Sequence, residues 1–156
     1  MQTTISSPVG PLAVTVADDG AVTRIGFGTG AVSDDPRLQT VVAQLREYFA
    51  GERTNFDLAL RPDGGSPFEL RVWQALLEIP YGETVSYGEI AARIGHPGKA
   101  RAVGRANGRN PIAIVCPCHR VIGSDGSLTG YGGGLENKRT LLDLEAGMLS
   151  LAIDTA

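Results

Sequence analysis

The chain has 156 residues, 42% of them hydrophobic and 20% charged, which suits one well-buried core or two small subdomains. Its longest uninterrupted apolar run, residues 112–116, is far shorter than the roughly 20 residues that a membrane helix needs. Residues 1–10 lack the basic flank and apolar core of a secretion signal, and two cysteines are too few for a disulfide scaffold. We therefore expect a cytoplasmic protein with no membrane partner.

Charge is distributed unevenly along the chain. The net charge is -3, yet residues 93–120 contain six Lys or Arg and no Asp or Glu, whereas the rest of the chain has 8 basic and 17 acidic residues. A basic block within an acidic protein predicts a localised anion-binding face. The alternative is a solvated, charge-rich turn region.

The first third of the chain predicts a small sheet with one helix. Residues 12–17 and 22–27 are β-prone runs around an Asp18-Asp19-Gly20 turn, which is a hairpin signature, and residues 55–60 resemble a further strand. Between them, apolar residues recur at helical spacing after Asp34 and Asp35, and Gly51 follows where the helix should end. We interpret that apolar stripe as core; it consists of Leu38, Val41, Val42, Leu45, Tyr48 and Phe49.

A linker is expected at residues 61–65, which contain one proline and two glycines. It separates an N-terminal domain over residues 1–62 from a C-terminal domain over residues 66–150. The second domain opens on Ser66-Pro67-Phe68-Glu69, a capping box with proline at the first helical position. The helix should end before Pro80, with Trp73 on it as a packing residue.

Two short helices and a tight turn come next. Ser86 and Glu89 form a second capping box for a helix that ends near Ile94, and residues 95–98 contain two glycines. A second helix should run from about Lys99 to Gly108, which completes a helix-turn-helix signature. Apart from its arginines, most residues of this second helix are small, and Arg101 and Arg105 share one face. This composition favours contact with nucleic acid over close packing in the core.

The last third combines a buried run, a glycine-rich loop and a closing helix. Residues 112–116 read as a strand buried on both faces. They lead to Pro117, Cys118 and His119, after which residues 123–134 form a loop long enough to be functional. Residues 135–145 predict the closing helix.

Cys118 is the candidate for covalent chemistry. A free thiol with a pKa of about 8.5 is only a few per cent ionised at neutral pH. His119 and Arg120, its neighbours, are expected to lower that pKa. A buried structural cysteine is the usual alternative, and it is the better interpretation for Cys116.

Two other site chemistries use the same residue types. Cys116, Cys118 and His119 do not have the spacing of a closed zinc site, and no distant cysteine pair completes one, so we expect no metal. A thiol hydrolase is possible, with Glu145 orienting His119, but a helix-turn-helix would serve no purpose in it.

The run from Ile114 to Gly123 contains the motif Pro-Cys-His-Arg-Val and resembles the O6-alkylguanine-DNA alkyltransferases, also called methylated-DNA-protein-cysteine methyltransferases. The resemblance covers about residues 66–146, and the first 60 residues match only loosely. Further motifs in the same order carry it: Tyr81-Gly82-Glu83, Val85-Ser86-Tyr87, residues 100–104, Asn110-Pro111, residues 131–135, Lys138, Leu141, Leu142 and Glu145.

The resemblance implies an α/β fold in two parts, namely a small ribonuclease H-like sheet-plus-helix domain and a mostly helical domain with a winged-helix-like helix-turn-helix. It implies a monomer that binds double-stranded DNA through the minor groove and flips out the alkylated guanine. Arg101 matches the arginine that fills the gap in the base stack. The residues expected to contact DNA are Tyr87, Gly88, His96, Lys99, Arg101, Arg105 and Ser124.

The implied reaction transfers the alkyl group to Cys118, the nucleophile, once per molecule and without a cofactor. His119 matches the base that takes the thiol proton through a water, and Glu145 the carboxylate that orients this histidine. Tyr87 matches the tyrosine that pushes the nucleotide out and protonates the departing base, and Asn110 the asparagine that ties the helix-turn-helix to the active-site turn. The expected pocket residues are Asn107, Val121, Tyr131 and Gly132.

The implied substrates are O6-alkylguanine and O4-alkylthymine in DNA. Asn107 and Gly132 stand where some relatives have Met and Ser, which leaves the tolerated size of the alkyl group open. Some family members bind zinc in their N-terminal region, but this chain has no cysteine before position 116. The competing interpretation is a non-catalytic DNA-binding protein that senses alkylation or regulates transcription, although the presence of Cys118 argues against it.

Overall fold

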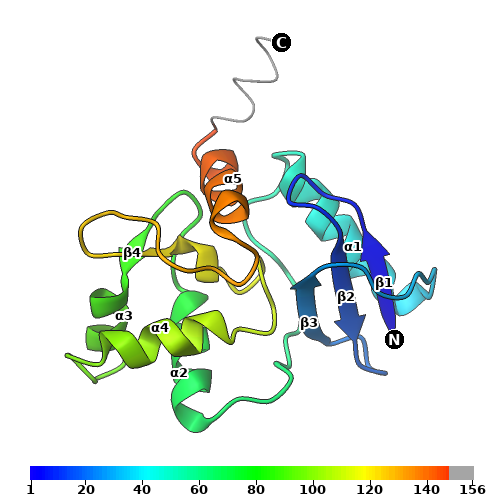
Figure 1. The fold of residues 1–156 in the computed structure, drawn as a ribbon. Helices are drawn as coiled ribbons and strands as arrows, with labels where there is room; N and C mark the ends of the chain where they lie inside the picture. The colour runs from blue at the N-terminus through cyan, green and yellow to red at the C-terminus, as the bar shows by residue number, and fades with distance from the viewer. Residues whose placement is uncertain (148–156) are drawn as a thin grey trace.

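The computed structural model describes residues 1–147, so residues 148–150 of the expected C-terminal domain lie outside the described part. In the α/β architecture, the N-terminal sheet and the helix over residues 36–49 lie on one side, the helices within residues 67–108 and the short strand at residues 85–86 lie on the other, and the helix over residues 135–145 lies between them (Figure 1). No helix within residues 1–147 is long and apolar enough to cross a membrane.

The N-terminal part is a three-stranded antiparallel sheet covered by one helix. Its strands are β1 (Gln2–Ile5), β2 (Leu12–Val16) and β3 (Val22–Phe27), in the order β1-β2-β3. Alternate residues of β2 are buried, as expected for a sheet with one face on the core. Helix α1 (Pro36–Phe49) begins after its N-cap Asp35, and its buried face includes most of the predicted apolar stripe.

Two predicted strands are wrong. Residues 55–60 form no strand, and only Leu60 among them bridges β3, at Val22. Phe56, Leu58 and Leu60 recur at every second position because they lie against the second domain. The alternation does not indicate pairing with a sheet. Residues 112–116 form a turn in which the amide of Cys116 donates to the Ile112 carbonyl over 3.0 Å, and Ile114 has a φ of 73°. That run is apolar because it is fully buried.

The C-terminal part is mainly helical. Both predicted capping boxes are confirmed, at Ser66 for α2 (Pro67–Leu76) and at Ser86 for α3 (Tyr87–Arg93). The helix-turn-helix is completed by α4 (Ala100–Gly108). The indole of Trp73 donates to the Ala106 carbonyl over 2.8 Å and ties α2 to α4, which is the packing role expected for it.

A parallel pair of two-residue strands positions the site. Strand β4 (Val85–Ser86) pairs with β5 (Val121–Ile122), in the register Val85 to Val121. Since α3 begins directly after β4 and the 3-10 turn η1 (Cys118–Arg120) directly precedes β5, this pairing fixes the position of Tyr87 relative to η1. The closing helix α5 (Leu135–Glu145) has the predicted bounds and packs against η1.

Candidate active site

Cys118 lines a cavity of about 200 Å³ between the two parts of the chain. Strand β3 supplies one wall, the C-terminal end of α4 a second, and the glycine-rich loop before α5 a third. The cavity brings Cys118 together with the predicted residues Asn107, Asn110, Tyr131 and Gly132. Val121 is fully buried in β5 and is not part of this lining.

Burial raises the pKa of the Cys118 thiol, which corrects the expectation of an ionised sulfur. Contacts with Asn110 and Tyr131 and the charge of Lys138 lower this pKa, but less than burial raises it. His119 and Arg120 do not act on the thiol as expected, because Glu145 binds both of their side chains. The cysteine is therefore protonated at neutral pH, and it would have to lose this proton to act as a nucleophile.

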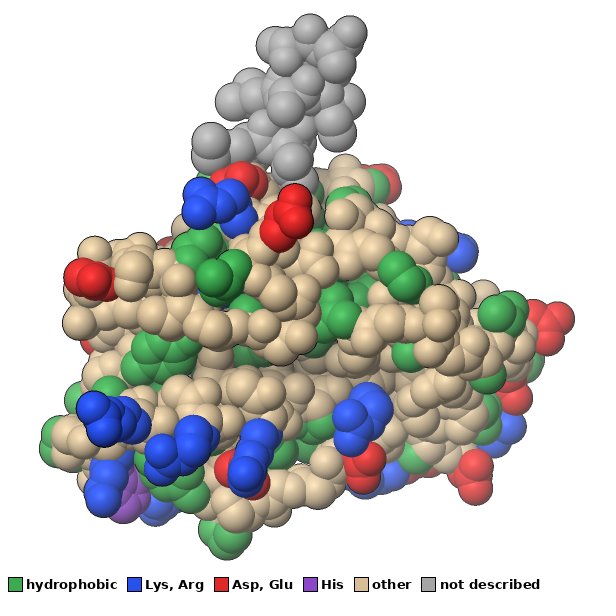
Figure 2. All heavy atoms as spheres, in the orientation of Figure 1, with side chains coloured by type: hydrophobic (Ala, Val, Ile, Leu, Met, Phe, Trp, Pro, Cys, Tyr) green, Lys and Arg blue, Asp and Glu red, His purple; other side chains and the backbone are tan. Residues whose placement is uncertain are grey.

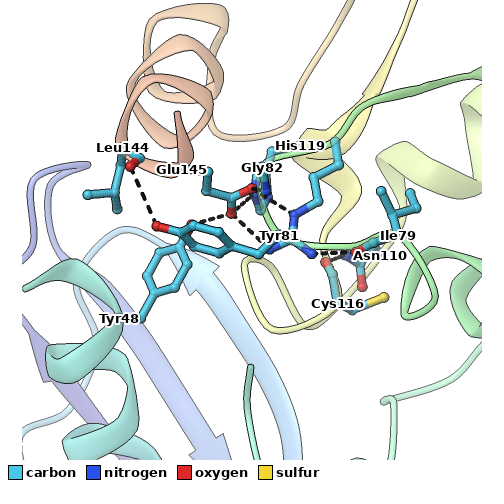
Figure 3. A network of polar contacts seen from close by, with 10 residues as sticks. Tyr48, Ile79, Tyr81, Gly82, Asn110, Cys116, His119, Leu144 and Glu145 are labelled. Carbon is cyan, nitrogen blue, oxygen red and sulfur yellow. Dashed lines mark hydrogen bonds and ion pairs between the residues drawn. The ribbon is translucent and has the colours of Figure 1, made fainter. Parts of the chain in front are cut away.

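Glu145 is the centre of a buried polar network (Figure 3). Its Oε2 accepts hydrogen bonds from His119 Nε2 over 2.7 Å and from Arg120 Nη2 over 3.0 Å, while Arg120 Nε donates to Oε1 over 2.8 Å. Burial alone raises the pKa of Glu145, but the hydrogen bonds and charges of His119 and Arg120 outweigh it and bring the pKa to about 2. The carboxylate is thus ionised at neutral pH.

The ionised carboxylate determines the tautomer of His119. Burial, together with the charges of Arg120 and Lys138, lowers the pKa of this imidazole more than Glu145 raises it, so the ring is neutral at neutral pH. Because a carboxylate only accepts, His119 must carry its proton on Nε2. Nδ1 is then left with a lone pair, is buried, and has no hydrogen-bond partner within residues 1–147. Nδ1 is thus the ring nitrogen that can accept a proton.

Two asparagines hold the backbone around the thiol. Asn110 Nδ2 donates to the Cys116 carbonyl over 2.8 Å, and its Oδ1 accepts from the Ile112 amide over 3.0 Å. Asn107, on α4, donates to the Cys118 carbonyl over 3.2 Å, and its Oδ1 has no partner in the described part of the chain. The helix-turn-helix is thereby joined to the cysteine turn, and a buried acceptor is left in the cavity wall.

A second hollow, of about 390 Å³, lies between α4 and the glycine-rich loop. Tyr87 and Arg101 both line it, together with Thr129, whose hydroxyl donates to the Tyr87 hydroxyl over 2.8 Å. Lys138 of α5 lies 6.0 Å from the centre of the Tyr87 ring and donates to the Thr129 carbonyl over 3.1 Å. Tyr87, the loop and α5 are therefore held together by Lys138, to which we assigned no role from the sequence.

Basic side chains gather over α4. Figure 2 shows Lys and Arg in a row along the lower part of the face that α4 occupies in Figure 1. Lys99, Arg101 and Arg105 are exposed, as a contact surface for DNA requires. Arg109 instead forms an ion pair with Glu69 of α2, over 3.3 Å.

The remaining predicted contacts differ in exposure. Gly88 and Ser124 are exposed, in the first turn of α3 and in the loop after β5. His96, in the turn of the helix-turn-helix, packs edge-on against Phe68, and its Nε2 lies 3.0 Å from Arg71 Nη1. This histidine is held against α2. Within residues 1–147, no group of three His, Cys, Asp or Glu is arranged to bind a metal ion.

Fold and site together define a two-part protein that places a buried Cys-His-Glu arrangement beside a basic helix-turn-helix. Two family models match the chain. Residues 1–62 match the ribonuclease-like domain of 6-O-methylguanine DNA methyltransferase, and residues 67–147 match its DNA-binding domain.

Individual relatives agree with these matches. A methylated-DNA–protein-cysteine methyltransferase of Mycobacterium bovis is 56% identical over 151 residues, with 91% of this chain and 90% of the relative covered. One of Methanosarcina acetivorans is 48% identical over 148 residues, with 89% and 94% covered. The crystal structure of Mycobacterium tuberculosis OGT in complex with DNA superimposes with a TM-score of 0.87, at 53% identity and with 94% and 93% of the two chains covered.

The chain belongs to the methylated-DNA–protein-cysteine methyltransferase family, as the Pro-Cys-His-Arg-Val motif indicated. The predicted fold class is confirmed, and so is the predicted activity, DNA repair by alkyl transfer. DNA is confirmed as the partner at the level of the family.

Proposed function

We propose that Cys118 accepts the alkyl group from O6-alkylguanine in double-stranded DNA, and also from O4-alkylthymine, once per molecule. The protein acts in the cytoplasm as a monomer. In this proposal, residues 66–150 carry the chemistry and the DNA contacts, and residues 1–62 serve as the scaffold. The observation that carries the proposal is that Cys118 lines a cavity and is followed by a neutral, buried histidine whose Nδ1 has no hydrogen-bond partner in the described part of the chain.

The reaction is an in-line displacement at the alkyl carbon. His119 Nδ1 takes the proton of the thiol, through a water, as the Cys118 sulfur forms its bond to carbon and the bond from carbon to guanine O6 breaks. Tyr87 gives a proton to the departing guanine. The balance is a thioether on the protein and an unmodified guanine in DNA, and no residue of the site offers a way to reverse the thioether.

The buried thiol explains the need for this proton transfer. A protonated sulfur is a weak nucleophile. Once the proton has left, the thiolate is a stronger nucleophile in a site that excludes bulk water. Glu145 keeps Nε2 of His119 occupied, so that the opposite nitrogen is the one that accepts. Exclusion of bulk water, apart from the one water that relays the proton, and a positioned base are thus what this pocket supplies.

DNA enters from the side of α4. We place α4 in the minor groove, with Lys99 and Arg105 near phosphates and Arg101 in the gap left by the extruded nucleotide. Tyr87 lines the same hollow as Arg101, which suits a residue that pushes the nucleotide out. Asn107, Tyr131, Gly132 and backbone near Val121 then read the base. Asn107 Oδ1, which has no partner within residues 1–147, offers it a hydrogen-bond acceptor.

The intact mass of the protein after incubation with methylated-guanine duplex DNA tests the proposal. We expect a gain of one methyl group in the full chain and none in Cys118→Ala. Cys116→Ala is the matched control, because Cys116 is also buried but its thiol points to the Trp73 carbonyl, and it should gain the methyl group. An unchanged mass together with tight binding of the lesion would instead indicate a non-catalytic sensor.

A further inference from the structure

The described part of the first domain makes one buried hydrogen bond to the catalytic network. Tyr48, on α1, donates its phenolic proton to Glu145 Oε2 over 2.6 Å, across 97 residues of sequence. Its side chain is completely buried. In Figure 3, Tyr48 reaches from the N-terminal side to the same carboxylate that holds His119.

The bond is placed where it affects His119 directly. Oε2 accepts from Tyr48, from His119 Nε2 at 2.7 Å and from Arg120 Nη2 at 3.0 Å. These three donors bind the same oxygen. Each hydrogen bond therefore reduces the negative charge that is available to the other two. The phenol also fixes the rotamer of Glu145, and thereby the position of Oε2 relative to the imidazole.

Tyr48 keeps its proton at every working pH. Burial raises the pKa of its phenol, and the charge of Glu145 raises it further. It is therefore a constant donor, unlike a group that titrates near neutrality. Its ring packs edge-on against Phe49 and Tyr81, so a phenylalanine could occupy the same space.

We infer that Tyr48 is a positioning residue of the transfer reaction, through which the N-terminal domain orients Glu145 and limits the proton affinity of His119. This rests on the proposed role of His119 as the base. Without the phenolic hydrogen bond, Oε2 would attract the protonated imidazole more strongly, and the pKa of His119 would rise. A base with a higher pKa is protonated over more of the acidic range, so the acid limb of the transfer rate moves to higher pH.

The other polar groups around Glu145 and His119 are the same in the unaltered chain and in Tyr48→Phe. Glu145 also lies near the Gly82 amide, at 3.5 Å, and near Tyr81, whose hydroxyl donates to the Leu144 carbonyl. The remaining charged groups that act on His119 are Arg120 and Lys138. None of these changes in Tyr48→Phe, and Tyr81→Phe offers a matched control that removes a phenol without removing a donor to the carboxylate.

The experiment is an NMR titration of the full-length chain carrying ¹⁵N-labelled histidine. The sequence has only two histidines, and His96 contacts Arg71 and Phe68 rather than Glu145, so it serves as an internal reference. In Tyr48→Phe we expect the His119 titration to move up by about half a pH unit or more. Tyr81→Phe should leave the His119 titration in place.

Single-turnover transfer rates between pH 5 and 9 complete the test, and the acid limb of Tyr48→Phe should follow the His119 titration. A His119 titration that is unchanged in Tyr48→Phe overturns the inference, even if the melting temperature falls, since a purely structural role predicts that result. A moved titration with an unmoved acid limb supports the influence of Tyr48 on His119 and counts against His119 as the base. The two proposals therefore fail separately.

Discussion

At the scale of single residues, the site depends on where protons reside. Cys118 is buried and protonated, Glu145 is buried and ionised, and His119 is neutral, with one ring nitrogen that has no hydrogen-bond partner among the described residues. The charge on Glu145 is tolerated because Arg120 and His119 supply hydrogen bonds to both of its oxygens. In the proposed mechanism, reactivity is therefore produced by proton transfer within the pocket and not by a thiolate formed in advance.

Tyr87→Phe tests the proton donor to the leaving base. The ring and its contact with Lys138 remain, but the hydroxyl that Thr129 contacts is lost. We expect the single-turnover rate to fall by about 100-fold, which is typical of the loss of a general acid, with DNA affinity changed little. Rapid-quench transfer assays and fluorescence anisotropy measure the two quantities. Unaltered transfer rates would remove this assignment.

At the scale of elements, helix caps determine how firmly the DNA-binding part is built. The Ser66 hydroxyl accepts from the Glu69 amide, and Glu69 Oε1 accepts from the Ser66 amide over 2.9 Å. Ser66→Ala should reduce the free energy of unfolding by about 1 kcal/mol, as measured by urea denaturation. Ser6→Ala, at an exposed serine outside any helix, should change it by much less. Equal effects would contradict a capping role.

The second prediction at this scale concerns α4. Arg101 is exposed on this helix and lines the same hollow as Tyr87. Arg101→Ala should slow repair of duplex DNA by about 10- to 100-fold, since an unfilled stack costs a few kcal/mol. Transfer from free O6-methylguanine base should change less. Arg46→Ala, an exposed arginine on α1, should leave both rates near those of the unaltered chain. Equal losses on duplex and free base would argue against the stack-filling role.

At the scale of the whole molecule, the buried network makes stability dependent on pH. The pKa of Glu145 falls from 4.5 to about 2 on folding, so the stabilisation it brings is complete above pH 4.5 and is lost as the pH falls towards 2. This difference in the pKa of Glu145 corresponds to about 3 kcal/mol in the free energy of unfolding. Burial also lowers the pKa of His119 from 6.5, which removes stability below pH 6.5 in the same direction.

Urea denaturation at pH 7, 5 and 3 checks this expectation. The free energy of unfolding should decrease at each step, and the decrease between pH 5 and 3 should be smaller in Glu145→Gln, which has no carboxyl group to protonate. That variant should also be less stable at pH 7 by about 3 to 5 kcal/mol, because Arg120 loses its buried counter-charge. A flat profile in the unaltered chain would contradict the assigned charge states.

Local signals in the sequence determined much of this protein. Capping residues at Ser66 and Ser86 defined where α2 and α3 begin, because a cap acts on the amides two or three residues away. The same short range made the helix-turn-helix and α5 predictable. The motif around Cys118 identified the family, since a contiguous run of residues carries it.

Only the tertiary structure decided the rest. Residues 112–116 satisfied the pattern of a buried strand, but a turn closed by Asn110 is equally apolar when the core surrounds it. Tyr48 belonged to an apolar helical stripe until the fold placed its hydroxyl on a carboxylate 97 residues away. The protonation of Cys118 likewise follows from burial by distant segments. Periodicity and capping act over a few residues, whereas desolvation and the pairing of buried charges depend on every chain segment that closes around the site.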